Sequence, residues 1–110
     1  MDLPNPRPLR GRTLDDGFTE LERDADGWAL FSIEAGEKKV ELFFGRRYPV
    51  ALIWEPASAS GQALNFICVE PMAGVPNAIN LNHAGKYPGL QIVPPGGQWS
   101  ESFWIRARGF

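Results

Sequence analysis

The chain has 110 residues and a mass of 12.2 kDa, enough for one domain whose core removes roughly 60 to 70% of the unfolded surface from water. Hydrophobic residues make up 44% of the sequence, and the formal net charge is -2. These values exclude the basic surface of a nucleic-acid-binding protein and an acidic tail, so we expect no nucleic-acid partner.

The single cysteine and the lengths of the apolar runs indicate the cellular compartment in which the protein is expected. Cys68 has no second cysteine with which to form an internal disulfide, which suits a reducing compartment, and its own role is expected to be that of a small buried hydrophobe. The longest apolar run, residues 50–54, is far too short to span a bilayer, and residues 1–12 lack the apolar core of a signal peptide. We therefore expect a cytoplasmic protein that does not enter a membrane.

The first thirteen residues are predicted to form an extended arm that leads into a single domain, residues 14–110. Three prolines fix the backbone of this segment and remove amide donors: Pro4, Pro6 and Pro8. The only basic cluster of the chain lies in the same arm and consists of Arg7, Arg10 and Arg12. A solvated face of the arm explains this cluster best, and a phosphate contact is the alternative.

A β-hairpin is predicted after a short element within residues 14–21. Residues 24–27 read Asp-Ala-Asp-Gly, which is typical of a turn, and residues 28–34 then alternate between two faces as a strand does. The segment 35–38 supplies the next turn around Gly36, and residues 39–44 form the returning strand.

Two further strands follow, and each is predicted to end at a Glu-Pro pair. Residues 50–54 contain no polar side chain, which predicts a core strand buried on both faces and ended by Glu55-Pro56. In the second strand, Phe66, Cys68 and Glu70 share one face, because successive side chains of a strand point to opposite sides. This strand is predicted to end at Glu70, before Pro71.

The remaining chain is predicted to contain strands and loops only. Residues 81–89 look irregular, a strand is expected near residues 90–93, and a turn at 94–97 precedes a last strand over residues 99–107. No window shows sustained helical spacing, whereas strand runs separated by Gly, Pro and Asn recur. The pattern favours an all-β fold, an antiparallel β-sandwich.

Glu70 is the carboxylate that this pattern singles out for chemistry. Pro71 disfavours helical backbone at the preceding residue, so Glu70 is held extended. Its apolar neighbours Phe66 and Cys68 are expected to raise its pKa by desolvation, which suits a general base that works near neutral pH. The alternative is an exposed glutamate that closes a strand.

Four segments, in this order, are similar to motifs of a known family: Leu14-Asp15-Asp16-Gly17-Phe18, Cys68-Val69-Glu70, Pro76-Asn77-Ala78-Ile79-Asn80 and Pro94-Pro95-Gly96-Gly97. They resemble the aldose 1-epimerase (galactose mutarotase) family. The resemblance covers nearly the whole chain but corresponds only to the C-terminal portion of a family member. It implies part of a galactose mutarotase-like supersandwich. The open sheet edges of such a portion predict self-association, a missing N-terminal portion that completes the sandwich, or a rearranged compact sandwich.

The resemblance implies an isomerase of carbohydrate metabolism that interconverts the α and β anomers of a hexose by acid/base ring opening and closure. Glu70 matches the base, and Asp15 matches the aspartate that accepts hydrogen bonds from sugar hydroxyls. Asp16 is an alternative match one residue further on, and the alternative role of either aspartate is that of a turn residue that satisfies local backbone amides. Asn77 is the candidate substrate contact in the loop after the strand. The reaction requires no cofactor and no metal.

Aromatic residues add a further candidate for sugar binding. Sugars stack on aromatic rings, and the chain has four tryptophans, Trp28, Trp54, Trp99 and Trp104. Core packing is the favoured role for most of them. Trp54, at the end of the predicted core strand, is the candidate substrate contact.

The general acid has no counterpart in the sequence. The family supplies it from a histidine and uses a second histidine to contact the sugar, but both lie upstream of the portion matched here. His83 is the only histidine of the chain and is predicted to lie on a surface loop. The alternatives to an active isomerase are therefore a non-catalytic carbohydrate-binding or assembly module, or a fragment without independent activity.

Overall fold

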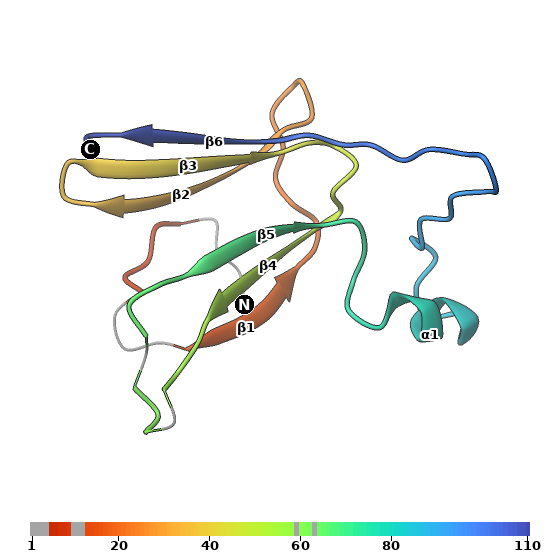
Figure 1. Ribbon diagram of the computed structural model, residues 1–110, viewed down its shortest axis with the longest axis horizontal. Coiled ribbons are helices and arrows are strands. Elements are labelled where there is room, and N and C mark those ends of the chain that lie inside the picture. Colours follow the sequence, from red (N-terminus) through yellow and green to blue (C-terminus); the bar gives the residue numbers. More distant parts are fainter. Residues whose placement is uncertain (1–4, 10–12, 59, 63) are drawn as a thin grey trace.

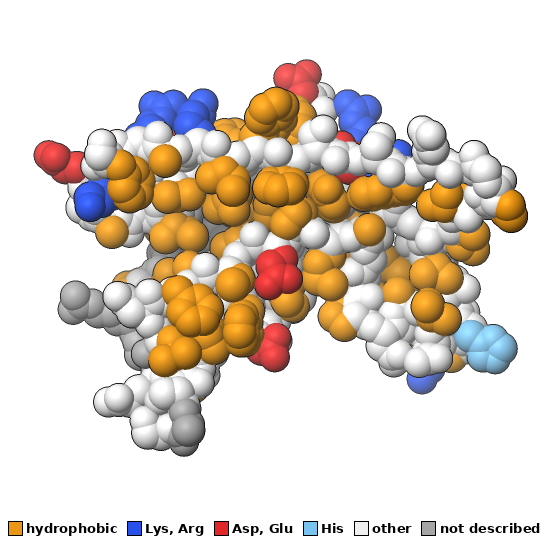
Figure 2. Space-filling view, in the orientation of Figure 1, with side chains coloured by type: hydrophobic (Ala, Val, Ile, Leu, Met, Phe, Trp, Pro, Cys, Tyr) orange, Lys and Arg blue, Asp and Glu red, His pale blue; other side chains and the backbone are white. Residues whose placement is uncertain are grey.

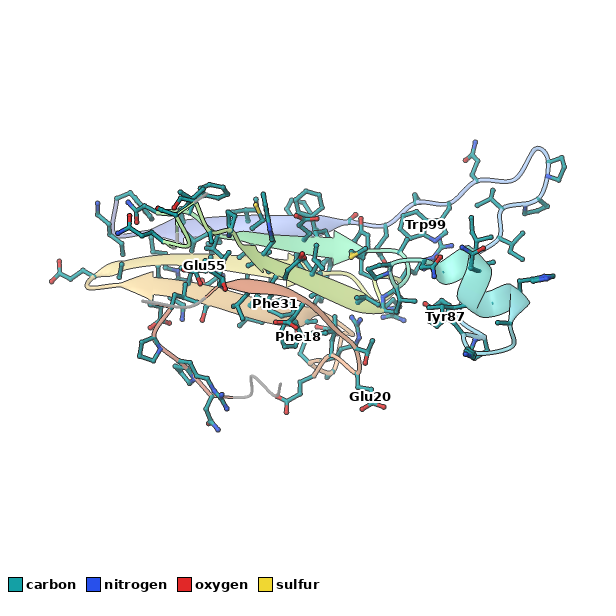
Figure 3. The ribbon with its side chains drawn as sticks, turned by 90° about the horizontal axis from the view of Figure 1, so that it is seen from below. Phe18, Glu20, Phe31, Glu55, Tyr87 and Trp99 are labelled. Carbon is teal, nitrogen blue, oxygen red and sulfur yellow. The ribbon has the colours of Figure 1, made fainter. Side chains whose placement is uncertain are left out.

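The protein is described by a computed structural model that covers residues 5–9, 13–58, 60–62 and 64–110. The described residues contain six strands and one short helix: β1 (Leu14–Phe18), β2 (Ala29–Ala35), β3 (Lys38–Phe44), β4 (Val50–Glu55), β5 (Cys68–Met72), α1 (Ala78–His83) and β6 (Phe103–Arg108). The strands form two three-stranded antiparallel sheets, sheet A with the order β1-β4-β5 and sheet B with the order β2-β3-β6. One sheet lies above the other (Figure 1), and the two overlap when seen from below (Figure 3). The predicted all-β antiparallel sandwich is confirmed.

The β2-β3 hairpin forms where the turn residues predict it. Ala35 pairs with Lys38, so Gly36 and Glu37 make a two-residue loop. Gly36 adopts a φ of 62°, which this kind of tight turn requires and glycine adopts without steric cost. The observed β2 and β3 agree with the predicted strands to within one residue at each end.

The core lies between the facing surfaces of the two sheets. Phe44 of β3 is completely buried and packs with Ala29 of β2 and Ala51 of β4, whose small side chains leave room for its ring. Phe31 adds an aromatic contact, with its ring centroid 5.0 Å from that of Phe44. A single cluster of apolar side chains therefore holds sheet A against sheet B.

The strand β4 occupies the centre of sheet A, as expected for the most apolar run of the chain. Val50, Ala51 and Ile53 are buried, and the strand ends at Glu55 as predicted. The expected burial of both faces fails at Trp54, which is 38% exposed. Trp54 lies on the outer face of sheet A, the face turned away from sheet B.

Glu70 does not end its strand, contrary to the prediction. It is the middle residue of β5, and Pro71 continues the strand opposite Ala51 of β4. A proline lacks the backbone N–H that a strand between two neighbours needs. Because β5 is an edge strand of sheet A, it has a partner strand on one side only, and edge strands are where sheets tolerate proline.

Three further predictions are wrong between residues 73 and 102. The helix α1 was not expected, because its six residues are too few for helical spacing to show, and none of them is buried. Residues 90–93 form no strand, and the side chain of Gln91 instead donates to the carbonyl oxygens of Arg47 and Ala73. The last strand begins at Phe103 rather than at residue 99.

The beginning of the chain has no regular secondary structure where it is described. Residues 5–9 and residue 13 belong to no strand or helix, and β1 begins at Leu14. Arg7 is exposed. Arg10, Arg12 and the first four residues lie outside the described part of the chain. Among the described residues, no helix is long and apolar enough to cross a membrane.

Candidate functional site

The strand register of sheet A brings Asp15 and Trp54 together. Asp15 of β1 lies opposite Trp54 of β4, and Trp54 lies opposite Cys68 of β5. Residues that are directly opposite in an antiparallel pair project to the same face of the sheet. Asp15, Trp54 and Cys68 therefore form one row on the outer face of sheet A.

Glu70 belongs to the neighbouring row on the same face. It lies two residues after Cys68 and opposite Leu52, which in turn lies opposite Gly17 of β1. Both Asp15 and Glu70 are exposed. Figure 2 shows acidic side chains among hydrophobic ones over this sheet. Three of the four predicted site residues thus share one surface.

Two aromatic side chains stand beside these acids. The rings of Trp54 and Phe66 meet edge to face, with centroids 5.8 Å apart and an interplanar angle of 73°. Phe66 is 49% exposed. Phe66 thus contacts Trp54 on the face predicted for it. The pair provides an accessible aromatic surface next to Asp15, to which the apolar face of a sugar ring can stack.

Asn77 does not join this surface. It adopts a left-handed φ of 61° immediately before α1, and its Oδ1 accepts a hydrogen bond of 2.6 Å from Nδ2 of Asn80. The helix lies to one side of both sheets (Figure 1). His83, the last residue of α1, is exposed, as predicted, and lies on this lateral segment rather than on the outer face of sheet A.

The two Glu-Pro pairs differ in the face that their glutamates occupy. Glu55 lies opposite the buried Leu14, is itself buried, and faces sheet B. Its Oε2 atom has no hydrogen-bond partner within the described parts of the chain. Glu70 is exposed on the outer face. Only the second glutamate is therefore available to a ligand from solvent.

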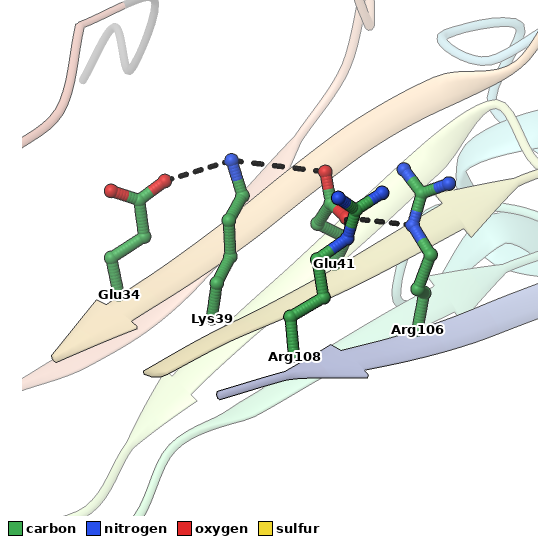
Figure 4. A network of polar contacts seen from close by, with 5 residues as sticks. All are labelled: Glu34, Lys39, Glu41, Arg106 and Arg108. Carbon is green, nitrogen blue, oxygen red and sulfur yellow. Dashed lines mark hydrogen bonds and ion pairs between the residues drawn. The ribbon is translucent and has the colours of Figure 1, made fainter. Parts of the chain in front are cut away.

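A second charged surface, on the outer face of sheet B, was not anticipated. Glu41 of β3 accepts a hydrogen bond of 2.7 Å from Nε of Arg106, and Nε of Arg108 lies 3.5 Å from the same Oε2 atom. Nζ of Lys39 lies 3.7 Å from the other oxygen of Glu41 and 2.9 Å from Oε1 of Glu34 (Figure 4). The alternation of charged residues along residues 39–41 and 106–108 is the only sequence signal for this network.

These contacts determine the charge states on sheet B. The hydrogen bond from Arg106 lowers the pKa of the Glu41 carboxyl below its ordinary value, and the charges of Arg106, Lys39 and Arg108 add to the effect. The hydrogen bond to Glu34 is the main reason that the pKa of Lys39 is raised. The network therefore favours the charged forms of Lys39, Glu41 and Arg106, and their opposite charges partly compensate one another.

A third cluster anchors the long segment that precedes β6. The carboxylate of Glu101 accepts hydrogen bonds from the backbone N–H groups of Ser102, at 2.8 Å, and Arg47, at 2.7 Å, and both lower its pKa. The guanidinium of Arg47 lies over the ring of Trp99, 4.9 Å from its centroid. Trp99 donates through Nε1 to Gln91. These contacts fasten the segment to the β3-β4 loop and have a structural role.

No described group of three or more His, Cys, Asp and Glu side chains has an arrangement that would hold a metal ion. Comparison of the chain with models of protein families, with curated proteins and with solved structures found no match.

Proposed function

We propose that this chain is the sugar-contacting C-terminal part of an aldose 1-epimerase-like isomerase, which interconverts the α and β anomers of a hexose. The observation that carries the proposal is the register that places Asp15, Trp54 and Glu70 on one face of sheet A. A three-stranded sheet is a rigid support for such a set. The motif around Glu70 and the acidic segment around Asp15 support the same assignment.

The spacing of the two acids suits a ligand that lies across β4. Asp15 and Glu70 sit on the two edge strands, two strand spacings and two residues apart, which corresponds to roughly 12 Å between their Cα atoms. Both residues lie on the outer face of sheet A, one on each side of the central strand β4. A hexose between them would stack on Trp54 and Phe66 and donate hydroxyl hydrogen bonds to Asp15.

Glu70 would then act as the general base. It would take the proton of the anomeric hydroxyl while an acid protonates the ring oxygen, so that the C–O bond of the ring breaks and an aldehyde forms. Rotation about the C1–C2 bond and the reverse proton transfers close the ring on the other face. The acid must come from outside this face, because the only histidine of the chain lies on α1. Additional polypeptide that completes the sandwich would supply it. Reduced Cys68 fits a cytoplasmic setting for this chemistry.

A titration with galactose and glucose, followed by saturation-transfer NMR, tests the proposed surface. Trp54→Ala should abolish the saturation transfer, and Asp15→Asn should weaken binding by about tenfold through the loss of a charge-assisted hydrogen bond. Glu37→Gln, at the exposed tip of the β2-β3 hairpin, is the matched control and should bind as the wild type does. Binding that survives both Trp54→Ala and Asp15→Asn would place the sugar elsewhere.

A non-catalytic carbohydrate-binding module is the second candidate, and the solvent exposure of Glu70 favours it. Polarimetry of freshly dissolved α-galactose separates the two functions. In an active assembly that includes this chain, Glu70→Gln should remove most of the acceleration of mutarotation. If that assembly binds sugar and does not accelerate anomer interconversion, the module is the correct description.

A further inference from the structure

The edge strand β6 is unusually exposed for a strand so rich in large apolar residues. All six of its residues are exposed, among them Phe103 at 50%, Trp104 at 63% and Ile105 at 62%. An edge strand offers unpaired N–H and C=O groups along one side, and natural proteins usually protect it with charges, proline or a covering segment. The sequence of β6 contains no proline, and its two charged residues, Arg106 and Arg108, are paired with Glu41 of its own sheet. Three of its first four residues are large and apolar or aromatic.

The row of apolar side chains on the inner face of sheet B continues onto β6. Phe103 lies opposite Phe44, and Ile105 lies opposite Leu42, so both project to the face of sheet B that packs on sheet A. Phe44 is completely buried, whereas Phe103 and Ile105 remain open to solvent. The inner layer is therefore incomplete on the β6 side. At the edge of sheet A formed by β5, in contrast, Pro71 removes a donor and blocks strand addition.

We propose that β6 pairs antiparallel with β6 of a second copy of this chain, with Ile105 opposite the partner's Ile105. This pairing joins the two copies of sheet B into one six-stranded sheet. The inference does not depend on the proposed sugar site, which lies on the other sheet.

The alternation of faces restricts the register. The apolar side chains of both copies stay on the inner face only if each inner-face residue pairs with an inner-face residue of the second copy. In a symmetric antiparallel pair, this requires that one residue lies on the two-fold axis and pairs with the same residue of the second copy. Centred on Ile105, the pairing uses five residues of β6 and puts Phe103 opposite the partner's Ala107. Centred on Arg106, it would place two arginines directly opposite each other, which is unfavourable. Centred on Trp104, it would use only three residues of the strand.

The outer face supplies complementary groups in this register. Trp104 lies opposite the partner's Arg106, and the two copies make this contact twice. Arg106 already lies over an aromatic ring of its own sheet, with its guanidinium carbon 4.9 Å from the centroid of Phe43. The same guanidinium is held by Glu41, so its charge is compensated before the second copy arrives. A cation–π contact across the edge is therefore available without an uncompensated buried charge.

The exposed area is consistent with a missing partner. The chain exposes 8162 Å², whereas a compact monomer of 12.2 kDa exposes about 6,000 Å². Residues 5–8 and the lateral segment around α1 contribute to this excess, and the apolar side chains of β6, which are 50–63% exposed, add to it.

Sedimentation equilibrium of the full chain, over a range of concentrations, tests the proposal. We expect a reversible dimer. Ile105→Lys, which places a charge on the inner side of the edge, should weaken dimerisation by roughly tenfold or more. Ile92→Lys is the matched control, because Ile92 is also exposed but lies outside the sheets, and it should leave the dimer intact. A chain that is monomeric at all concentrations overturns the proposal.

Disulfide trapping tests the register without a destabilising charge. In a Cys68→Ser background, Ile105→Cys should form a covalent dimer on mild oxidation, because paired residues of neighbouring strands have Cα atoms about 4.5–5.5 Å apart. Ala107→Cys and Phe103→Cys should not cross-link alone but should cross-link when mixed. Efficient cross-linking of Ala107→Cys alone, or none with Ile105→Cys in a chain that dimerises, would contradict the register.

Discussion

The outer faces of the two sheets both carry carboxylates, but among the described residues only those of sheet B are paired with cations. Glu41 has Arg106, Arg108 and Lys39 within ion-pair distance, and it is only 6% exposed. Asp15 and Glu70 on sheet A are exposed, and neither takes part in an ion pair among the described residues. A carboxylate whose oxygens already accept hydrogen bonds from neighbouring cations is less able to accept hydrogen bonds from a ligand. The exposed carboxylates of sheet A are therefore the ones that the proposed sugar site would use, whereas the Glu41 carboxylate is engaged in an ion-pair network within sheet B.

The largest expected effect comes from the core that supports both faces. Phe44→Ala should reduce the free energy of unfolding by about 3–5 kcal/mol, because it removes a completely buried ring from between the sheets. Urea denaturation measures the change. Leu30→Ala, at an exposed position of the neighbouring strand, is the control and should change stability by less than about 0.5 kcal/mol. Similar midpoints for the two variants would mean that the sheets do not share one core.

A smaller loss of stability should distinguish the outer face of sheet B from the outer face of sheet A. Arg106→Gln removes the closest partner of the buried Glu41 carboxylate and should lower the urea midpoint by less than Phe44→Ala does. Glu70→Gln, on the outer face of sheet A, should leave the midpoint unchanged. If Glu70→Gln were as destabilising as Arg106→Gln, the carboxylates of sheet A would have a structural role and the contrast between the faces would fail.

The smallest effect is the acid dependence of stability. The hydrogen bond from Arg106 lowers the pKa of Glu41 in the folded protein below the ordinary value of 4.5. The folded state therefore binds this proton less readily than the unfolded state does. The resulting stabilisation is present in full above the unfolded pKa and is lost as the pH falls through the folded pKa. Thermal unfolding between pH 6 and pH 3 should show a shallower decline for Glu41→Gln than for the wild type; parallel declines would exclude this contribution.

Much of the strand pattern was predictable because it depends on neighbours along the chain. The hairpin follows from alternation and from Gly36, and the core strand follows from the apolar run that begins at Val50. The same local rules failed where a segment depends on distant contacts. Residues 90–93 have the composition of a strand, but they form none, and the side chain of Gln91 instead bonds to the carbonyl oxygens of Arg47 and Ala73.

The candidate site was predictable as a set of residues but not as an arrangement. The resemblance singled out Asp15 and Glu70, and Trp54 was a candidate because sugars stack on aromatic rings. That these three share a face depends on the register between β1, β4 and β5. Asn77 was placed with them because its motif resembles the loop that follows the strand in the family, yet the turn before α1 carries it to the side of the sheets.

The amino-acid sequence by itself determined which segments are extended and which side chains alternate, because side-chain direction along a strand has a period of two residues. Only the tertiary structure decided which strands pair, which faces are covered and which charges meet. Glu41 and Arg106 are 65 residues apart and come together through the pairing of β3 with β6. Such long-range pairing is set by how the apolar faces of all the strands can be buried at once, so it cannot be deduced from any one segment.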